Sequence, residues 1–127
     1  MIEIIPKKNL NAAEIKVLRE ISSLSISQIK KASSEGTSIR CFEAFVNNWE
    51  EQRVELVSIY HLYLEDDAPF TVVNLDSGTQ ELLTPEQLYS TFKFWRSIEL
   101  KEQKNSDLEM GYINNPNEFL PHDEDWV

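Results

Sequence analysis

The chain has 127 residues, of which 41% are hydrophobic and 10% aromatic, and this composition excludes a disordered polymer. Its length predicts one globular domain with a single core. No apolar run approaches the roughly 20 residues that span a bilayer, and the first residues lack the pattern of a signal peptide. The single cysteine, Cys41, excludes an internal disulfide, so we expect a cytoplasmic location.

The formal net charge of −10 is divided unevenly along the chain. Residues 1–64 contain 8 Lys/Arg and 8 Asp/Glu, whereas residues 65–127 contain 4 Lys/Arg and 14 Asp/Glu. The second half therefore holds the whole negative excess, which repels nucleic acid and anionic membranes and attracts basic partners. Solubility alone explains the acidity equally well, and the segregation of the charge is what keeps binding as an alternative explanation.

The first part of the chain predicts a strand and then two short amphipathic helices. Residues 2–5 are a short apolar run of the kind found in an edge strand. Asn11–Glu14 and Ser25–Gln28 have the form of capping boxes, and apolar residues follow each of them at helical spacing. Gly36 predicts a left-handed end to the second helix.

The middle of the chain predicts further strands and two longer helices. Residues 39–45 alternate like a strand, and Cys41 is expected in the core. Helices are expected over Trp49–Leu64 and from Pro85 to about Glu102. Between them, residues 70–75 have strong β propensity, and residues 79–83 are expected to form a short returning strand after a turn.

These elements predict an α+β fold with a small antiparallel sheet of three or four strands and helices packed on one face. The expected order is β-α-α-β-α-β-(β)-α, with residues 1–104 forming a single domain. Residues 105–127 contain several Pro and Asn, which oppose a long helix. They also contain aromatic residues, so we expect an acidic, extended tail docked on the same domain.

The two short helices resemble those in the C-terminal domain of the bacterial ribosomal stalk protein. The matching stretches are Glu14–Ile21 and Leu24–Ala32, although Ser22–Ser25 replaces the Gly-rich joint of that family. The stalk domain recruits translation factors through basic and apolar residues of these helices. The resemblance therefore implies an adaptor function. The matching stretches contain Lys16, Arg19, Lys30 and Lys31, and the expected contacts are Lys16, Arg19 and Lys30.

As a whole, the chain looks like a small bacterial immunity protein of the contact-dependent growth inhibition type. The features that carry this resemblance are the acidic composition, Asn47–Glu51 at the start of a long helix, and the ending Gly111–Trp126. Proteins of this class bind a cognate toxin domain, often a basic nuclease, and block its active site. The resemblance implies the same function here.

Several residues suggest chemistry, and in each case a structural role is favoured. His61 stands alone in a predicted helix, whereas a general base needs a partner and a cleft. His122–Asp125 offers oxygen ligands for a divalent cation, but it lacks the spacing and glycine turn of a known loop. We therefore expect no enzyme activity, no metal site and no cofactor.

The leading hypothesis is a non-enzymatic protein that neutralises a basic toxin domain, with a stalk-like adaptor as the alternative. Electrostatic steering by the acidic half would speed association. An exposed aromatic residue among acids can anchor a basic protein, although pinning the tail to the body is the favoured role of Trp126. The residues expected to contact the partner are Asp66, Asp67, Asp107, Glu109, Asp123, Glu124, Asp125 and Trp126.

Overall fold

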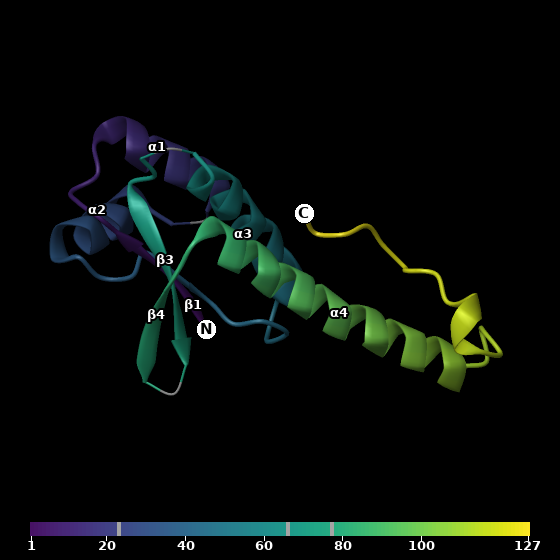
Figure 1. Ribbon diagram of the computed structural model, residues 1–127. Helices are drawn as coiled ribbons and strands as arrows, with labels where there is room; N and C mark the ends of the chain where they lie inside the picture. The colour runs from purple at the N-terminus through teal and green to yellow at the C-terminus, as the bar shows by residue number, and fades with distance from the viewer. Residues whose placement is uncertain (23, 66, 77) are drawn as a thin grey trace. The chain divides into compact units, whose positions relative to one another are not determined.

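The computed structural model describes residues 1–22, 24–65, 67–76 and 78–127, and within them the chain forms a four-stranded antiparallel sheet with four α-helices (Figure 1). The predicted fold class and element order are confirmed, including the returning strand. Along the chain the elements are β1 (Ile2–Pro6), α1 (Ala12–Ile21), α2 (Ile26–Glu35), β2 (Arg40–Phe42), α3 (Trp49–Tyr63), β3 (Phe70–Asp76), β4 (Thr79–Leu83), α4 (Pro85–Glu109) and the 3₁₀ turn η1 (Pro116–Glu118).

The chain divides into two compact units, Met1–Leu88 and Tyr89–Val127. The first unit holds the sheet, α1 to α3 and the first turn of α4. The second unit holds the rest of α4 and the segment that follows it. A compact unit is a cluster of contacts rather than a folding domain, so the predicted single domain over residues 1–104 stays a prediction.

Local capping interactions fix the two short helices where the sequence predicts them. The Asn11 side chain accepts from the Glu14 amide at 2.9 Å, and the Glu14 carboxylate accepts from the Asn11 amide at the same distance. The reciprocal pair at the start of α2 joins Ser25 and Gln28. These bonds satisfy amide groups that a helix N-terminus otherwise leaves without partners. Gly36 ends α2 with a φ of +67° in the left-handed region.

The strand order β2-β1-β3-β4 places β1 inside the sheet, so the expectation that residues 2–5 form an edge strand is wrong. Pro6, which suggested an edge, is only the last residue of β1. One apolar row crosses the centre of the sheet. Ile4 pairs with Val72, and Val72 pairs with Leu83 on the next strand. Residues that are directly opposite on neighbouring strands point to the same side of a sheet, so these three share one face, and all three are buried. This face of the sheet forms the floor of the core.

Helices α1, α2 and α3 form a layer over this buried face. Tyr63 of α3 stacks on Phe70 with ring centroids 5.8 Å apart, and its hydroxyl donates to the Leu83 carbonyl at 2.5 Å. Arg40 of β2 donates two hydrogen bonds of 2.9 Å to the Glu55 carboxylate on the same helix. Helix α1 contacts both α2 and α3, and α2 contacts β1. The predicted packing of helices on one face of the sheet is thereby confirmed.

The prediction that Cys41 lies in the core is wrong. Cys41 pairs with Glu3 in the register between β1 and β2, so its exposed side chain lies on the opposite face of the sheet. The neighbouring Phe42 is fully buried instead. Only one of two adjacent residues in a strand can face the core, and the larger apolar side chain takes that place.

The second difference is the length of α4, which ends at Glu109 rather than at about Glu102. Residues 103–109 contain no Gly or Pro, and Asn105 alone is too weak a breaker to stop the helix. The break comes at Gly111, whose φ is +77°, and the amide of Tyr112 donates back to the Asp107 carbonyl at 2.9 Å. This bond closes the helix in the manner of a left-handed C-cap.

The contrast between two isoleucines of α2 gives a test of the core. Ile29 is 0% exposed and Ile26 is 44% exposed. We expect Ile29→Ala to lower the free energy of unfolding by about 2–4 kcal/mol, because it removes buried methyl groups and leaves a cavity. Ile26→Ala, on the same helix, should change it by less than about 1 kcal/mol. Urea denaturation measures both, and equal losses would contradict this assignment of the core.

A second test uses Cys41 and Glu3, whose Sγ and carboxylate oxygen lie 3.6 Å apart. Desolvation and the negative charge of Glu3 raise the pKa of the Cys41 thiol above its ordinary value of 9.0. A raised pKa leaves less of the reactive thiolate at pH 8, so labelling by a thiol reagent should be slow and should accelerate as the pH rises. Glu3→Gln should speed labelling at pH 8 by about twofold to fivefold, whereas Glu20→Gln should not. An unchanged rate in Glu3→Gln would refute the assigned cause.

Candidate functional site

The predicted partner-binding residues lie in different parts of the molecule. Asp66 lies outside the described residues. Asp67 belongs to the first unit, where it is exposed after α3 and has a φ of +59°. The other six residues lie in the second unit: Asp107, Glu109, Asp123, Glu124, Asp125 and Trp126. The candidate site is therefore built from α4 and the chain that follows it.

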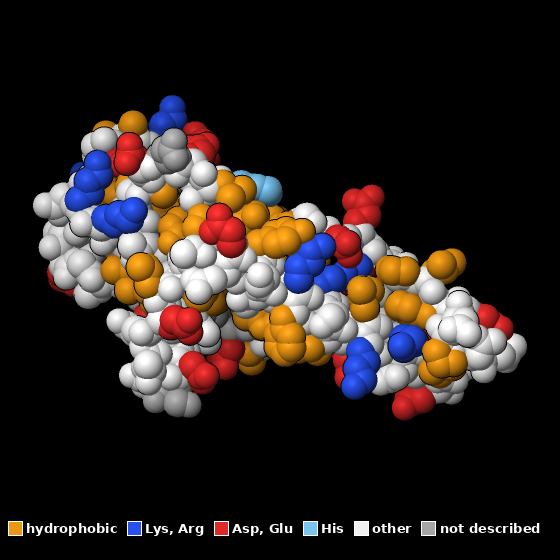
Figure 2. Space-filling view, viewed as in Figure 1, with side chains coloured by type: hydrophobic (Ala, Val, Ile, Leu, Met, Phe, Trp, Pro, Cys, Tyr) orange, Lys and Arg blue, Asp and Glu red, His pale blue; other side chains and the backbone are white. Residues whose placement is uncertain are grey.

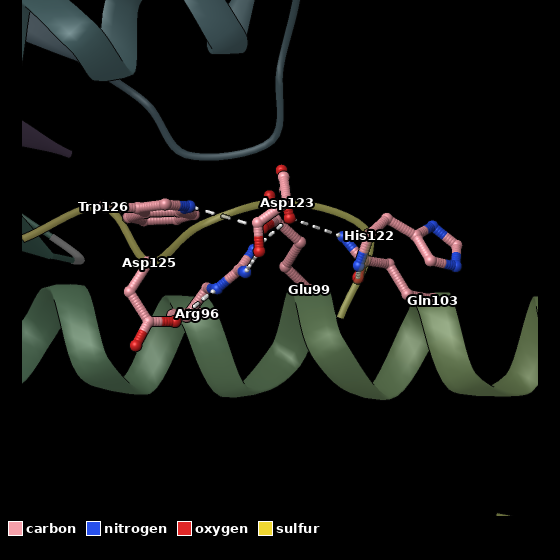
Figure 3. Close-up of polar contacts among 7 residues, drawn as sticks. All are labelled: Arg96, Glu99, Gln103, His122, Asp123, Asp125 and Trp126. Carbon is pink, nitrogen blue, oxygen red and sulfur yellow. Dashed lines mark hydrogen bonds and ion pairs between the residues drawn. The ribbon is translucent and has the colours of Figure 1, made fainter. Parts of the chain in front are cut away.

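Residues 110–127, here named the return segment, turn at Gly111 and run back along α4 (Figure 1). They meet a polar face of the helix formed by Arg96, Glu99, Gln103 and Asp107. Steps of three and four residues place these side chains one above another on the same side of a helix. Figure 3 shows three of them, Arg96, Glu99 and Gln103, pointing from α4 toward the return segment.

Arg96 is the centre of this contact, and it is only 5% exposed. Its Nη1 donates to the Asp123 carboxylate at 2.8 Å and also to Glu99. Its Nε donates to the Asp125 carboxylate at 3.1 Å, and its Nη2 donates to the Asp123 carbonyl at 2.8 Å (Figure 3). The guanidinium group therefore holds two acids of the return segment against one acid of α4.

The charges around Arg96 are unbalanced. Burial opposes the charged form of the guanidinium, but hydrogen bonds to Asp123, Asp125 and Glu99 outweigh it and raise the pKa of Arg96. One positive charge faces three carboxylates, so the group as a whole keeps an excess of negative charge. The side chains of Asp123 and Asp125 are 46% and 60% exposed, which leaves this excess at the surface.

Two further contacts extend the docking of the return segment in both directions. Toward the end of α4, the His122 ring lies 2.8 Å from the Asp107 carboxylate, and the His122 amide donates to the Gln103 side chain at 3.1 Å. At the other end, the Trp126 indole donates to Glu99 at 3.3 Å. The predicted acids Asp107, Asp123 and Asp125, together with Trp126, are thus engaged within the chain.

The docked segment gathers carboxylates into a surface that we name the acidic strip, which consists of Glu99, Asp107, Asp123, Glu124 and Asp125. Glu124 is exposed between two acids that bond Arg96. Glu109 is exposed at the last residue of α4, beyond the strip. Arg96, Glu99 and Gln103 were missing from the sequence-based prediction, and their spacing on one face of a predicted helix was the signal that could have found them.

The basic residues of the alternative hypothesis lie together on the first unit. Lys16 and Arg19 of α1 and Lys30 of α2 line one open groove of about 600 Å³. Its other lining residues are Ala12, Ile15, Glu20 and Ile26. Figure 2 shows Lys and Arg side chains over the region of α1 and α2. The helical hairpin that the sequence predicts is what brings the three bases to a common rim.

The residues considered for chemistry hold ordinary positions. His61 is exposed on α3, with its ring 5.5 Å from that of Tyr60. His122 pairs with a carboxylate, but its own side chain is 48% exposed and the pair joins the return segment to α4. Within the described residues, no cluster of three or more His, Cys, Asp or Glu is arranged to hold a metal ion. The described helices also include none that is long and apolar enough to cross a membrane.

Comparison with known proteins finds no matching family model, no similar curated protein and no similar solved structure. The resemblances to immunity proteins and to the stalk domain therefore stay predictions, and the function has to be argued from the two surfaces themselves.

The role of Arg96 can be tested by hydrogen exchange of the return segment. Arg96→Gln removes the charge and the forked donor geometry, so residues 119–127 should exchange at least about tenfold faster. Arg96→Lys keeps the charge but not the fork and should give an intermediate rate. Lys101→Gln is the matched control, because it makes the same charge change at an exposed position of α4. Unchanged exchange in Arg96→Gln would show that other contacts hold the segment.

Proposed function

We propose that the chain is a non-enzymatic immunity protein whose acidic strip docks on the basic face of a cognate toxin domain and occludes its active site. A nuclease domain fits this proposal well, because its substrate is a polyanion and its active site is therefore rimmed by positive charge. The observation that carries the proposal is the gathering of carboxylates along one face of the second unit around a single buried cation.

The electrostatics of the strip suit this role. Three acids of the strip, Glu99, Asp123 and Asp125, bond one buried base, Arg96, which is 5% exposed. The field outside the strip is therefore negative, and such a field raises the association rate with a basic partner by steering the encounter. The effect weakens as salt screens the charges, with a screening length of about 8 Å at physiological ionic strength.

The internal contacts of the strip also support binding. Hydrogen bonds to Arg96 and Gln103 order the return segment before a partner arrives. A surface that is already ordered loses less conformational entropy on association, so more of the interaction energy remains as affinity. In this proposal Asp107, Asp123 and Asp125 build the strip.

The residues left for direct contact are those with the most exposed carboxylates. Glu124 and Glu109 are exposed, and the Asp125 side chain is 60% exposed beside its bond to Arg96. Trp126 is half-buried on Glu99, so its place in the proposal is to hold the segment rather than to project into the partner.

The test is binding to the toxin domain encoded beside this gene. Reversing two exposed acids in the double variant Glu109→Lys/Glu124→Lys should lower the association rate at low salt by about tenfold or more, and should reduce protection of cells. Glu43→Lys/Glu81→Lys is the matched control, since it makes the same charge change at exposed positions of the first unit.

Stopped-flow or surface-plasmon kinetics measures both double variants, with urea denaturation to confirm that each is folded. Equal slowing by the two would assign the effect to net charge alone. Unchanged kinetics in Glu109→Lys/Glu124→Lys, or no complex with the wild-type chain, would refute the proposal.

A further inference from the structure

The groove between α1 and α2 differs in charge from the rest of the chain. It has three basic residues on its rim, Lys16, Arg19 and Lys30, and one acidic residue, Glu20. The first unit that carries it has 14 Asp/Glu and 8 Lys/Arg by sequence. A local surplus of positive charge on a negative body is an unusual arrangement, because it gains nothing for solubility.

The three bases of the rim are not used to hold the fold together. All three are exposed, and within the described residues none lies within 4.0 Å of a carboxylate. Two other bases of this unit are paired, since Lys8 lies 3.4 Å from Glu14 and Arg40 lies 2.9 Å from Glu55. The rim therefore presents exposed positive charge beside apolar surface, which suits a partner that carries carboxylates.

The inside of the groove is apolar. Ala12 and Ile15 line it from α1, and Ile26 lines it from the first turn of α2 with 44% of its surface exposed. Exposed Ile in a hollow is an anchor site for an apolar side chain, as in the grooves that accept amphipathic helices. Its volume of about 600 Å³ lies in the range that takes a few side chains rather than a single ion.

We propose that the α1–α2 groove is a docking site for an acidic amphipathic peptide segment of a partner protein. Apolar side chains of the segment rest on Ile15 and Ile26, and its carboxylates pair with the basic rim. A small anion leaves the apolar surface uncovered, and nucleic acid is disfavoured by the surplus of carboxylates on the same unit. The site lies outside the acidic strip and binds a partner of the opposite charge, so it does not depend on the proposed toxin binding.

The experiment uses the ¹⁵N-labelled full-length chain and a synthetic 12-residue peptide with four Glu on one helical face and Leu and Phe on the other. Saturable shifts confined to residues 12–30 are expected. A peptide with Gln in place of each Glu should bind about tenfold more weakly, and so should the chain variant Lys16→Gln/Lys30→Gln. Ile26→Ala should also weaken binding.

The matched control is Lys16→Gln/Lys31→Gln. Lys31 is an exposed neighbour of Lys30 that does not line the groove, so this variant should keep more of the affinity than the Lys16→Gln/Lys30→Gln variant. Retention of the amide spectrum outside the groove confirms the fold of each variant.

Four outcomes would overturn the proposal. The first is the absence of saturable shifts at millimolar peptide, and the second is equal binding of the Glu and Gln peptides. The third is tighter binding of a single-stranded RNA 12-mer, which would assign the rim to nucleic acid. The fourth is a concentration-dependent shift of the same signals in the free chain, which would assign the groove to a second copy.

Discussion

The burial of one guanidinium group, that of Arg96, determines how the second unit is arranged. Moving a cation out of water carries a large free-energy penalty, which is offset only when hydrogen bonds and opposite charges surround it. Glu99 supplies one carboxylate from α4 itself, and Asp123 and Asp125 supply two more from the return segment. The return segment therefore depends on these ionic contacts, since within the described residues none of its apolar side chains is fully buried.

Much of the fold could be predicted because its signals are local. The capping boxes at Asn11 and Ser25 involve residues three apart, and they form as the sequence indicates. The pairing of Cys41 with Glu3, 38 residues away, could not be predicted, whereas the choice of Phe42 over Cys41 for the core follows from the larger apolar side chain. The end of α4 could have been predicted from the sequence. Apart from Asn105, Gly111 is the first residue after Pro85 that favours a left-handed conformation.

The candidate site could be predicted only in part, because its contacts join residues that are far apart in the sequence. The acids near the end of the chain are visible in the composition, but their roles depend on contacts such as that between Arg96 and Asp125, which are 29 residues apart. The net charge of a segment predicts that its carboxylates face solvent or a partner. It does not show that Arg96 of the same chain binds them. The bases Lys16, Arg19 and Lys30 come together more predictably, because two short helices joined by a few residues place them on neighbouring turns.

A net charge of −10 describes neither surface well. The acidic strip attracts a basic protein and repels an acidic one, and the rim of the α1–α2 groove does the reverse. In the two proposals, like charges raise the free energy of the wrong complex, so each surface would reject the partner proposed for the other. The two proposed sites share no residues, so their partners would not compete, provided that Arg96 keeps the carboxylates of Asp123 and Asp125 in place on the second unit.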